Sequence, residues 1–429
     1  MKNTQTTRRD FLRKAGAIGA AGAVAGCAKD KAAAPVEVAA VAPAPKPEAV
    51  RRVIGANDRV RCAFVGVGGR GSSLLSTALR IKDIEPIAIC DTYDSARMNA
   101  ADKCKQVNPN IKNYIKFEEM FEAENLDAVV IATPDHLHAS VIMAALDRKI
   151  DVYCEKPMTF HWEDAKAIRN CANETGAIVQ IGTQLRSTDI YNKAREIAQS
   201  GELGKLIMVQ VNRNAWDGMA TYNKPPEGAT AENTHWPLFV RDTKEYPFDA
   251  RRYFQWRLFE DYSNGVTGDL MLHHLDICQY ISGCGMAERV MSVGGIYHYH
   301  DGRTVHDTMS ALVKFPEDFH FNYTTTLVNG KYGLEERYLF SDGTIEFSRM
   351  NTMTVSRKSN APEEVVTTKG LDTLGHIQNW VDSIRSRKQP VTGVEAGMRG
   401  AILCRMAMQS QVSGQAAQWD SANEAVVMG

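Results

Sequence analysis

The sequence predicts an α/β protein whose first half is a doubly wound parallel sheet and whose second half is an α+β domain with a large, mostly antiparallel open sheet. Three observations support this prediction. Short apolar segments alternate with helical segments between residues 60 and 182. A glycine-rich turn, Gly66-Val67-Gly68-Gly69-Arg70-Gly71, follows the first apolar segment. After residue 183 the apolar segments become longer and partly alternate with polar residues, as antiparallel strands do.

Composition excludes several classes of protein. Of 429 residues, 44% are hydrophobic and 24% are charged, and 50 Lys+Arg face 51 Asp+Glu, for a formal net charge of −1. A chain with this apolar content and low net charge is not disordered as a whole. The charge balance gives no support to a nucleic-acid-binding protein, which usually has a basic excess. Nine cysteines without a CxxC pair do not form a disulfide scaffold, so we expect mostly free, buried thiols.

The first residues resemble an export signal. Residues 1–26 combine a basic start with a short, weakly apolar Ala/Gly run, and residues 7–13 (TRRDFLR) resemble a twin-arginine motif. Val24-Ala25-Gly26-Cys27 resembles a lipobox, with a plain signal as the alternative. Residues 27–57 are an Ala/Pro-rich tether. We therefore expect twin-arginine export to the periplasm and a lipid anchor at Cys27.

The glycine-rich turn occurs in the context typical of a dinucleotide site. A strand at Val60–Val65 precedes it, and helical spacing follows at Ser72–Arg80. Its three motif glycines have separate tasks: the first allows the tight turn, the second lets the backbone approach a pyrophosphate, and the third lets the helix pack on the strand. The helix N-terminus offers free N–H groups to the phosphates. The alternative is a tight turn without a ligand.

An acidic residue stands at the distance expected for ribose recognition. The next predicted strand, Pro86–Cys90, ends at Asp91, 20 residues after Gly71. The Asp91 carboxylate is suited to accept hydrogen bonds from a ribose diol and to repel a 2′-phosphate. NAD is therefore the expected cofactor, with NADP as the alternative.

The strand–helix alternation continues to residue 182 and predicts a Rossmann domain over residues 58–182. Because ligands bind outside the carboxyl ends of parallel strands, we expect the loops 66–71, 133–138 and 155–157 to form the site. The further predicted strands are Asn125–Ala132, Asp151–Cys154 and Ala177–Gly182, and the helices are Ser140–Asp147 and Glu163–Gly176.

Residues 183–429 are predicted to form a substrate-binding and oligomerisation domain. An Asp342-Gly343 turn connects two of its strands. Helices at 375–387 and 397–411 are expected to pack back on the first domain. Other strands are predicted at residues 206–212, 289–297, 308–315 and 320–327.

The combined motifs resemble the Gfo/Idh/MocA oxidoreductases over roughly residues 58–420. The segment Asp269–Asp276 (DLMLHHLD) is similar to the family pattern D-x-G-x-H-x-x-D, except that Met271 replaces the usual Gly. The other matching motifs are the turn 66–71, Ala132-Thr133-Pro134 with His138, Glu155-Lys156-Pro157, Gly182–Arg186, residues 376–390 and Trp419-Asp420.

The resemblance implies a catalytic set of Lys156, His273 and Asp269, in which Lys156 and His273 contact the reacting sugar hydroxyl and Asp269 supports them. The chemistry agrees, because imidazole can take the hydroxyl proton and a lysine cation can stabilise an alkoxide. Asp269, His273 and Asp276, spaced i, i+4, i+7, are expected on one helix face. The implied cofactor residues are Gly66, Gly68, Gly69, Arg70, Gly71, Asp91, Thr133, Pro134, His138, Glu155, Lys156 and Gln184; residues expected beside the substrate are Arg186, Trp256, His274 and Asp276.

Each of these assignments has an alternative. Lys156 could be a surface lysine after a strand, and His138 is expected to shape the cofactor pocket more than to do chemistry. His273 could bind a metal with Asp269 and Asp276. Because no fourth ligand is evident, we predict no metal site.

Aromatic residues are concentrated between residues 216 and 262, with charged residues interleaved. Such a segment suits the apolar faces of sugars, and it equally suits an oligomer interface. Its members are Trp216, Tyr222, Trp236, Phe239, Tyr246, Phe248, Tyr253, Phe254, Trp256, Phe259 and Tyr262.

Export constrains the expected chemistry, because there is no NAD to exchange outside the cytoplasm. We therefore expect an oxidoreductase that acts on a sugar, sugar derivative or other polyol with a retained cofactor, coupling one oxidation to one reduction. The first alternative is a redox-neutral, NAD-dependent glycoside hydrolase that oxidises, eliminates, adds water and reduces again. The second is a non-catalytic sugar-binding lipoprotein. The resemblance also implies a homo-oligomer, either a dimer or a tetramer.

Overall fold

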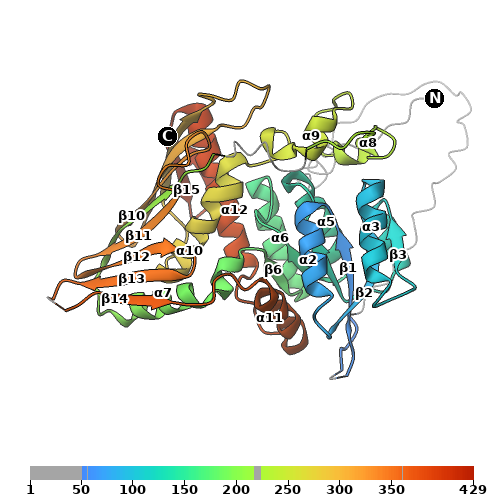
Figure 1. Ribbon diagram of the computed structural model, residues 1–429, viewed down its shortest axis with the longest axis horizontal. Helices are drawn as coiled ribbons and strands as arrows, with labels where there is room; N and C mark the ends of the chain where they lie inside the picture. Colours follow the sequence, from blue (N-terminus) through green and yellow to red (C-terminus); the bar gives the residue numbers. More distant parts are fainter. Residues whose placement is uncertain (1–50, 56, 217–223, 360) are drawn as a thin grey trace, which may run out of the picture. The chain divides into compact units, whose positions relative to one another are not determined.

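The computed structural model describes residues 51–55, 57–216, 224–359 and 361–429 (Figure 1). The predicted signal, its Cys27 and almost all of the tether lie outside the described residues, so their roles stay predictions. Within the described ranges, no helix combines the length and apolar character needed to span a membrane.

The first sheet has six parallel strands in the order β3-β2-β1-β4-β5-β6. This confirms the predicted doubly wound Rossmann sheet. The strands β4, β5 and β6 are buried along their whole length, as expected for strands covered on both faces. The strands are β1 (Val60–Val65), β2 (Ile84–Cys90), β3 (Lys112–Tyr114), β4 (Ala128–Ile131), β5 (Asp151–Cys154) and β6 (Val179–Ile181).

Helices cover both faces of this sheet, and two of them begin earlier than the apolar spacing predicts. One starts within the glycine turn at Gly69, and another starts at Asp135, directly after Pro134. Their first turns are polar or glycine-rich, which is why a hydrophobic pattern does not detect them. Both N-termini therefore lie at the carboxyl ends of strands. The helices are α2 (Gly69–Ala78), α3 (Asp94–Cys104), α4 (Phe117–Ala123), α5 (Asp135–Leu146) and α6 (Trp162–Thr175).

The second sheet has ten strands in the order β14-β13-β12-β11-β7-β10-β9-β8-β15-β16. The β7–β10 pair is parallel and the other neighbouring pairs are antiparallel, which confirms the predicted open, mostly antiparallel sheet. The strands are β7 (Leu206–Arg213), β8 (Arg289–Gly295), β9 (Thr308–Phe315), β10 (Phe319–Thr326), β11 (Leu334–Phe340), β12 (Gly343–Arg349), β13 (Thr352–Arg357), β14 (Glu364–Thr367), β15 (Ala417–Asp420) and β16 (Ala425–Met428).

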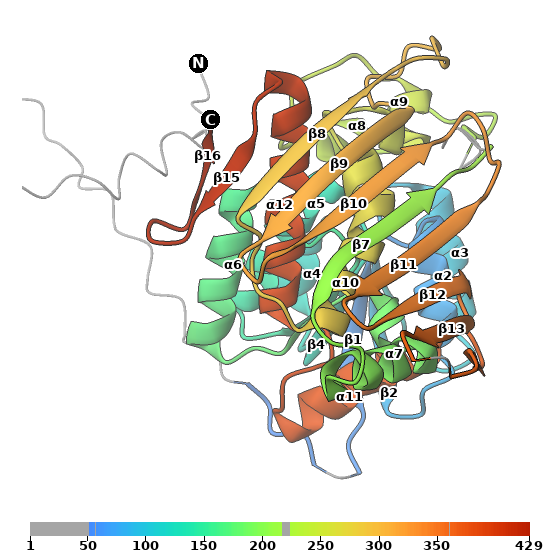
Figure 2. The same ribbon diagram turned by 90° about the vertical axis from the view of Figure 1, so that its left-hand side faces the viewer.

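One face of the second sheet packs on helices, and Figure 2 shows α10 and α12 behind the strands. The opposite face exposes apolar side chains: Met291 is 51% exposed, Val293 65% and Leu312 53%. As predicted, two C-terminal helices pack back on the first half: α11 supplies Trp380 to the core shared with α2, and α12 contacts α6. The longer helices of this half are α7 (Asp189–Ser200), α10 (Leu272–Ser282), α11 (Thr373–Ser386) and α12 (Val394–Ser413).

Two irregular regions link the halves. A short helix, η1 (Gln184–Ser187), follows β6, and a π-helix, η3 (Thr267–Met271), leads into α10. Between β7 and η3 the chain forms α8 (Trp236–Phe239), α9 (Ala250–Phe254) and η2 (Trp256–Leu258). Figure 1 shows α8 above α3 and α9 above α5. The eight cysteines among the described residues are free and seven are buried, which confirms the expectation of buried thiols.

Candidate active site

The glycine turn after β1 forms a cradle for a pyrophosphate. Gly66 has a φ of +78°, and a side chain there would meet the backbone of Thr133 at 2.7 Å. A side chain at Gly71 would overlap the Gly66 carbonyl oxygen. At Gly68, in contrast, an added Cβ would meet no atom within 4 Å, so this side of the turn is open. The first turn of α2 has no side-chain cap, which leaves its N–H groups available to an anion.

Asp91 is held rigidly at the end of β2. Its Oδ2 accepts a hydrogen bond from the Val67 N–H at 2.6 Å, and its Oδ1 accepts one from the Tyr93 N–H at 2.8 Å. Burial raises the pKa of Asp91, although these two N–H groups favour the ionised carboxylate. The geometry fixes both carboxylate oxygens beside the glycine turn, where the ribose of a dinucleotide is expected.

A pocket of about 990 Å³ lies along these carboxyl ends. This volume is at the upper end of the roughly 300–1,000 Å³ typical of ligand pockets. Its lining includes a residue predicted to contact substrate, Trp256. The predicted cofactor residues in its lining are Gly66, Gly68, Gly69, Arg70, Asp91, Thr133 and Pro134. The open cradle, the fixed acid and the pocket volume all fit a dinucleotide.

Two other predicted cofactor residues, Glu155 and Gln184, do not line the pocket but hold a residue that does. Glu155 Oε1 accepts hydrogen bonds from Arg70 Nε at 2.8 Å and from Gln184 Nε2 at 2.9 Å. Gln184 Nε2 also donates to the Tyr153 hydroxyl at 3.0 Å. Glu155 and Gln184 thus orient Arg70, which lines the pocket.

His138 connects two of the predicted loops. One ring nitrogen lies 2.7 Å from the Pro157 carbonyl oxygen and the other 2.9 Å from that of Thr133. The side chain is buried and is not part of the pocket lining. It therefore ties the loop after β4 to the loop that carries Lys156.

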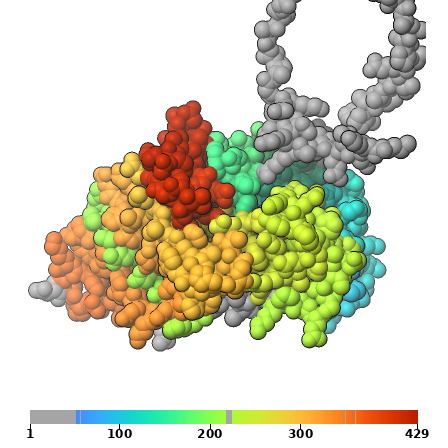
Figure 3. Space-filling model, turned by 90° about the horizontal axis from the view of Figure 1, so that it is seen from above, coloured from blue at the N-terminus to red at the C-terminus, as the bar shows by residue number. Residues whose placement is uncertain are grey.

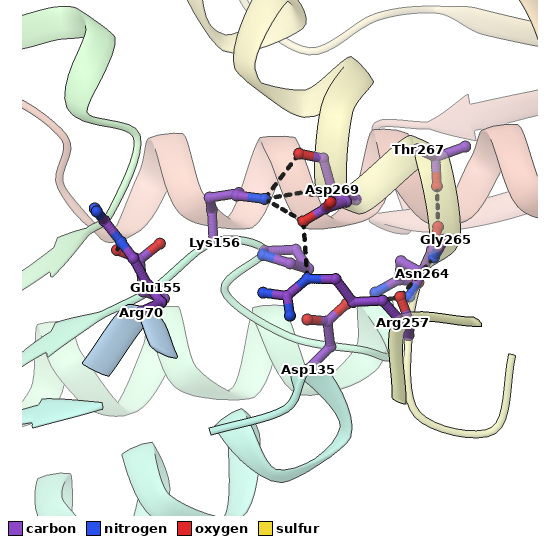
Figure 4. Close-up of polar contacts among 12 residues, drawn as sticks. Arg70, Asp135, Glu155, Lys156, Arg257, Asn264, Gly265, Thr267 and Asp269 are labelled. Atoms are coloured by element: carbon purple, nitrogen blue, oxygen red, sulfur yellow. Dashed lines mark hydrogen bonds and ion pairs between the residues drawn. The ribbon is translucent and has the colours of Figure 1, made fainter. Parts of the chain in front are cut away.

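The predicted catalytic residues Lys156 and Asp269 are in direct contact (Figure 4). Lys156 Nζ lies 3.0 Å from Asp269 Oδ1 and 2.8 Å from the Asp269 carbonyl oxygen. Arg257 Nε lies 3.3 Å from the same Oδ1. Because Arg257 also lines the pocket, it connects the pocket wall to this ion-pair cluster.

The electrostatics of the cluster fix the protonation states of two groups. Burial opposes ionisation of Asp269, but the Lys156 and Arg257 cations hold its pKa below the ordinary value. Burial and the Lys156 cation hold the pKa of His273 well below the ordinary value. At neutral pH Asp269 is therefore ionised and His273 is neutral. His273 Nδ1 has no hydrogen-bond partner in the described chain.

The π-helix modifies the predicted shared helix face. Asp269 and the fully buried Met271 lie on η3, whose wider turn interrupts the α-helical spacing that the prediction assumes. Asp276, further along α10, contacts Arg186 through Nε at 2.8 Å and Nη2 at 2.7 Å. Both carboxylate oxygens of Asp276 are therefore occupied by Arg186.

The structure places three of the predicted substrate residues away from the pocket lining. Arg186 and Asp276 form the buried pair described above, and His274 Nδ1 lies 3.0 Å from Glu336 Oε2 on β11. In the described part of the chain, no three His, Cys, Asp or Glu side chains are grouped to hold a metal ion.

Two residues of the site have no role in the sequence prediction. The sequence does not distinguish Arg257 from the other charged residues of the aromatic segment. It indicates Asp135 only as a member of the predicted ligand-binding loop 133–138. Asp135 is buried, and its Oδ2 accepts a hydrogen bond from the Asn264 N–H at 3.1 Å. Burial raises its pKa to about 7, against the effects of that N–H and of the Lys156 and Arg257 cations. Its position directly after Thr133-Pro134 is the one sequence signal that could have identified it.

The aromatic segment packs on the first half of the chain. Phe239 is stacked on Trp236 at a ring distance of 5.3 Å and lies 5.2 Å from the His136 ring, and Phe254 meets Tyr93 at 5.1 Å. This packing is within one chain, so the two predicted roles of the segment, a sugar surface and an oligomer interface, stay predictions. Tyr222 lies outside the described residues.

Comparisons with known proteins match both halves. A model described as "Oxidoreductase family, NAD-binding Rossmann fold" matches residues 60–183, and one described as "GFO/IDH/MocA C-terminal domain" matches residues 237–346. Inositol 2-dehydrogenase of Salmonella typhimurium is 27% identical over 205 residues, 47% of this chain and 56% of that protein. A glycosyl hydrolase family 109 protein of Shewanella baltica is 31% identical over 177 residues, 39% of this chain and 37% of that protein.

The fold is also similar to solved structures. Aldose-aldose oxidoreductase from Caulobacter crescentus, complexed with glycerol, has a TM-score of 0.65 at 16% identity, covering 84% of this chain and 99% of that chain. The sequence matches span only about half of the inositol dehydrogenase and a smaller part of the hydrolase.

Proposed function

Because the chain belongs to the Gfo/Idh/MocA oxidoreductase family and its first half is an NAD-binding Rossmann domain, we propose that it oxidises a secondary hydroxyl of a sugar, sugar derivative or polyol by hydride transfer to NAD and returns this hydride to the carbonyl group of a second substrate. The observation that carries this proposal is the contact of Lys156 with Asp269 beside a neutral His273. A lysine cation and a neutral histidine within one electrostatic cluster are suited to the removal of a hydroxyl proton.

We propose a separate role for each residue of the cluster. When bound, NAD supplies the acceptor and donor of the hydride. Lys156 binds the substrate oxygen and stabilises the negative charge that develops on it. His273 takes the hydroxyl proton at a ring nitrogen. Its lowered pKa keeps the ring unprotonated at neutral pH, so that it can accept this proton. Asp269, held ionised by Lys156 and Arg257, fixes the position of the lysine.

The location proposed for the protein demands that the cofactor stay bound. The twin-arginine resemblance at residues 7–13 supports export of a folded chain with NAD inside it. We place the protein in the periplasm, with Cys27 as the lipid attachment point. The hydride taken from one substrate then has to be returned to a second substrate on the same enzyme.

A redox-neutral glycoside hydrolase is the second candidate. The 31% identity with a glycosyl hydrolase family 109 protein favours it. In this reaction the hydride removed from the sugar returns to the same sugar after elimination and water addition, so no second substrate is needed.

The open face of the second sheet supports a homo-oligomer. Its exposed apolar side chains Met291, Val293 and Leu312 lie on neighbouring strands, β8 and β9. Apolar surface of this kind is typical of a subunit interface. We propose that two copies pair through this face.

One experiment separates these functions. The purified full chain is denatured, its released nucleotide is identified by absorbance and mass, and sugars, polyols and glycosides are screened without added NAD. Turnover that requires two sugars or polyols supports the oxidoreductase, and product from a glycoside alone supports the hydrolase. Absence of bound or bindable nucleotide contradicts both functions.

A further inference from the structure

Residues 224–262 come from the second half of the chain but pack on the first half. They follow β7, carry α8 and α9, and return to η3. In Figure 3 this yellow-green segment forms a continuous surface beside the cyan surface of the nucleotide-binding half.

The first contacts of the segment are with the residues that follow Asp91. The hydroxyls of Thr92 and Tyr253 are hydrogen-bonded at 2.7 Å. The ring of Tyr93 meets that of Phe254 edge to face at 5.1 Å. The segment is therefore fastened directly beside the acid expected to bind the ribose.

Further contacts fasten it to α3, α4 and α5. The Asp94 N–H donates to the Asn233 carbonyl oxygen at 3.0 Å, and His235 Nε2 lies 3.1 Å from Asp94 Oδ1. Arg241 forms an ion pair with Glu118 at 2.5 Å. On α5, His136 Nε2 lies 2.7 Å from the Phe239 carbonyl oxygen, and Ser140 donates to Asp242 at 2.6 Å. These contacts surround one end of the pocket.

The same segment forms the wall of that end. Leu238, Phe239, Tyr253 and Phe254 line the pocket opposite Ile115, Phe117, Leu137 and Val141 of the first half. An apolar slot next to a ribose-binding acid suits a flat purine ring, and aromatic side chains give it faces to pack on. The phosphate-binding turn and Arg257 line the rest of the pocket.

We propose that residues 224–262 complete the adenosine-binding end of the NAD site and determine how slowly the cofactor is released. This proposal rests on the proposed function, since it takes NAD as the bound group. It adds that the second half of the chain, through Tyr253, Phe254 and Phe239, provides adenosine-binding residues. Dissociation of the cofactor requires the contacts with Thr92, Asp94 and Glu118 to open first.

The test compares the release of labelled NAD from the wild-type chain and from variants. Protein loaded with radiolabelled NAD is mixed with excess unlabelled NAD, and the bound label is followed over time. We expect at least tenfold faster release from Tyr253→Phe, which loses the hydrogen bond to Thr92, and from the His235→Ala/Arg241→Ala variant. Tyr280→Phe is the matched control. It loses the 2.6 Å hydrogen bond that Tyr280 on α10 donates to Asn192 on α7, and it should release NAD at the wild-type rate.

The outcomes are distinguishable. Unchanged release from both segment variants, at an unchanged melting temperature, overturns the role of residues 224–262 and leaves the proposed function standing. A wild-type chain that binds no NAD overturns the proposed function, and this inference with it. Faster release from the segment variants and not from Tyr280→Phe supports the proposal.

Discussion

The amino group of Lys156 lies 3.0 Å from the carboxylate of Asp269, and this ion pair joins the two halves of the molecule. Lys156 follows β5 of the first sheet, and Asp269 lies on η3 at the start of α10. The candidate active site therefore exists only when the Rossmann half and the sheet half are folded against each other. Arg257, as a second cation on Asp269, comes from the segment that also lines the pocket.

Replacing Lys156 with alanine should abolish most turnover and leave the cofactor bound. Removal of one group that stabilises the developing charge typically lowers kcat by about 10²–10³-fold. NAD binding should persist, because Lys156 is not part of the pocket lining. Steady-state kinetics and nucleotide content measure the two effects.

The matched control is Lys205→Ala, which removes an exposed lysine 3.5 Å from Asp318. It should keep wild-type kcat and nucleotide content. Equal activity of Lys156→Ala and Lys205→Ala would show that Lys156 does not act on the substrate.

Alanine at Gly68 and alanine at Gly71 should have opposite effects. A Cβ at Gly68 meets no protein atom within 4 Å, so the fold should keep its melting temperature while the methyl group obstructs the pyrophosphate. We expect at least tenfold weaker NAD binding. A Cβ at Gly71 overlaps the Gly66 carbonyl oxygen, and such overpacking costs about 1–3 kcal/mol of stability.

Calorimetric titration of NAD and thermal melting distinguish the two variants. Loss of stability in Gly68→Ala, or full NAD affinity in it, would contradict the assignment of its open side to the phosphates. The two glycines are three residues apart in one turn, so each serves as the control for the other.

The Rossmann domain was predictable because its signals are local. Buried apolar strands, a glycine turn and an acid at a fixed distance specify the β1–α2–β2 unit without long-range information. The apolar spacing does not detect the start of α5 at Asp135, because the first turn of this helix carries polar residues. The π-helix at Asp269 also escapes prediction, since its sequence has ordinary α-helical spacing.

The sequence predicted where charged residues lie in the fold better than it predicted which residues they pair with. Arg186 and Asp276 are 90 residues apart in the chain, and neither local pattern indicates that they form a buried pair. The packing of the aromatic segment on Tyr93 is likewise a long-range contact. Composition could indicate that residues 216–262 form a surface for binding, but not which surface they would meet.

Asp135 should make stability depend on pH. Its pKa is about 7 in the folded chain and near the ordinary value of about 3.9 when unfolded. The stability that a protonated Asp135 contributes is present below the unfolded value and is lost as pH rises through about 7. Asp135→Asn stays neutral, so its advantage over wild type should grow with pH, up to about 4 kcal/mol.

Urea unfolding of both chains at pH 5, 6, 7 and 8 measures this difference. Asp318→Asn, at an exposed carboxylate, controls for the general loss of a surface charge. An Asp135→Asn advantage that is constant between pH 5 and pH 8 would contradict the raised pKa of Asp135.

The pair of Arg186 and Asp276 should serve stability and not substrate binding. Their side chains are 9% and 3% exposed, and two hydrogen bonds of 2.7 and 2.8 Å join them. Truncating one partner of a buried pair leaves an uncompensated charge and costs about 3–5 kcal/mol. Replacing both partners with apolar residues removes that penalty. We therefore expect Arg186→Ala to be strongly destabilised and the Arg186→Met/Asp276→Leu variant to be much closer to wild type.

Urea unfolding of the single and double variants gives their stabilities, and KM for the substrate found in the screen gives the functional readout. If the pair is structural, the double variant keeps the wild-type KM, because Arg186 occupies both carboxylate oxygens of Asp276. If Arg186 or Asp276 binds the substrate, KM rises in the double variant even though its stability is restored. Restored stability together with a raised KM would therefore support the predicted role of Arg186 and Asp276 in substrate binding.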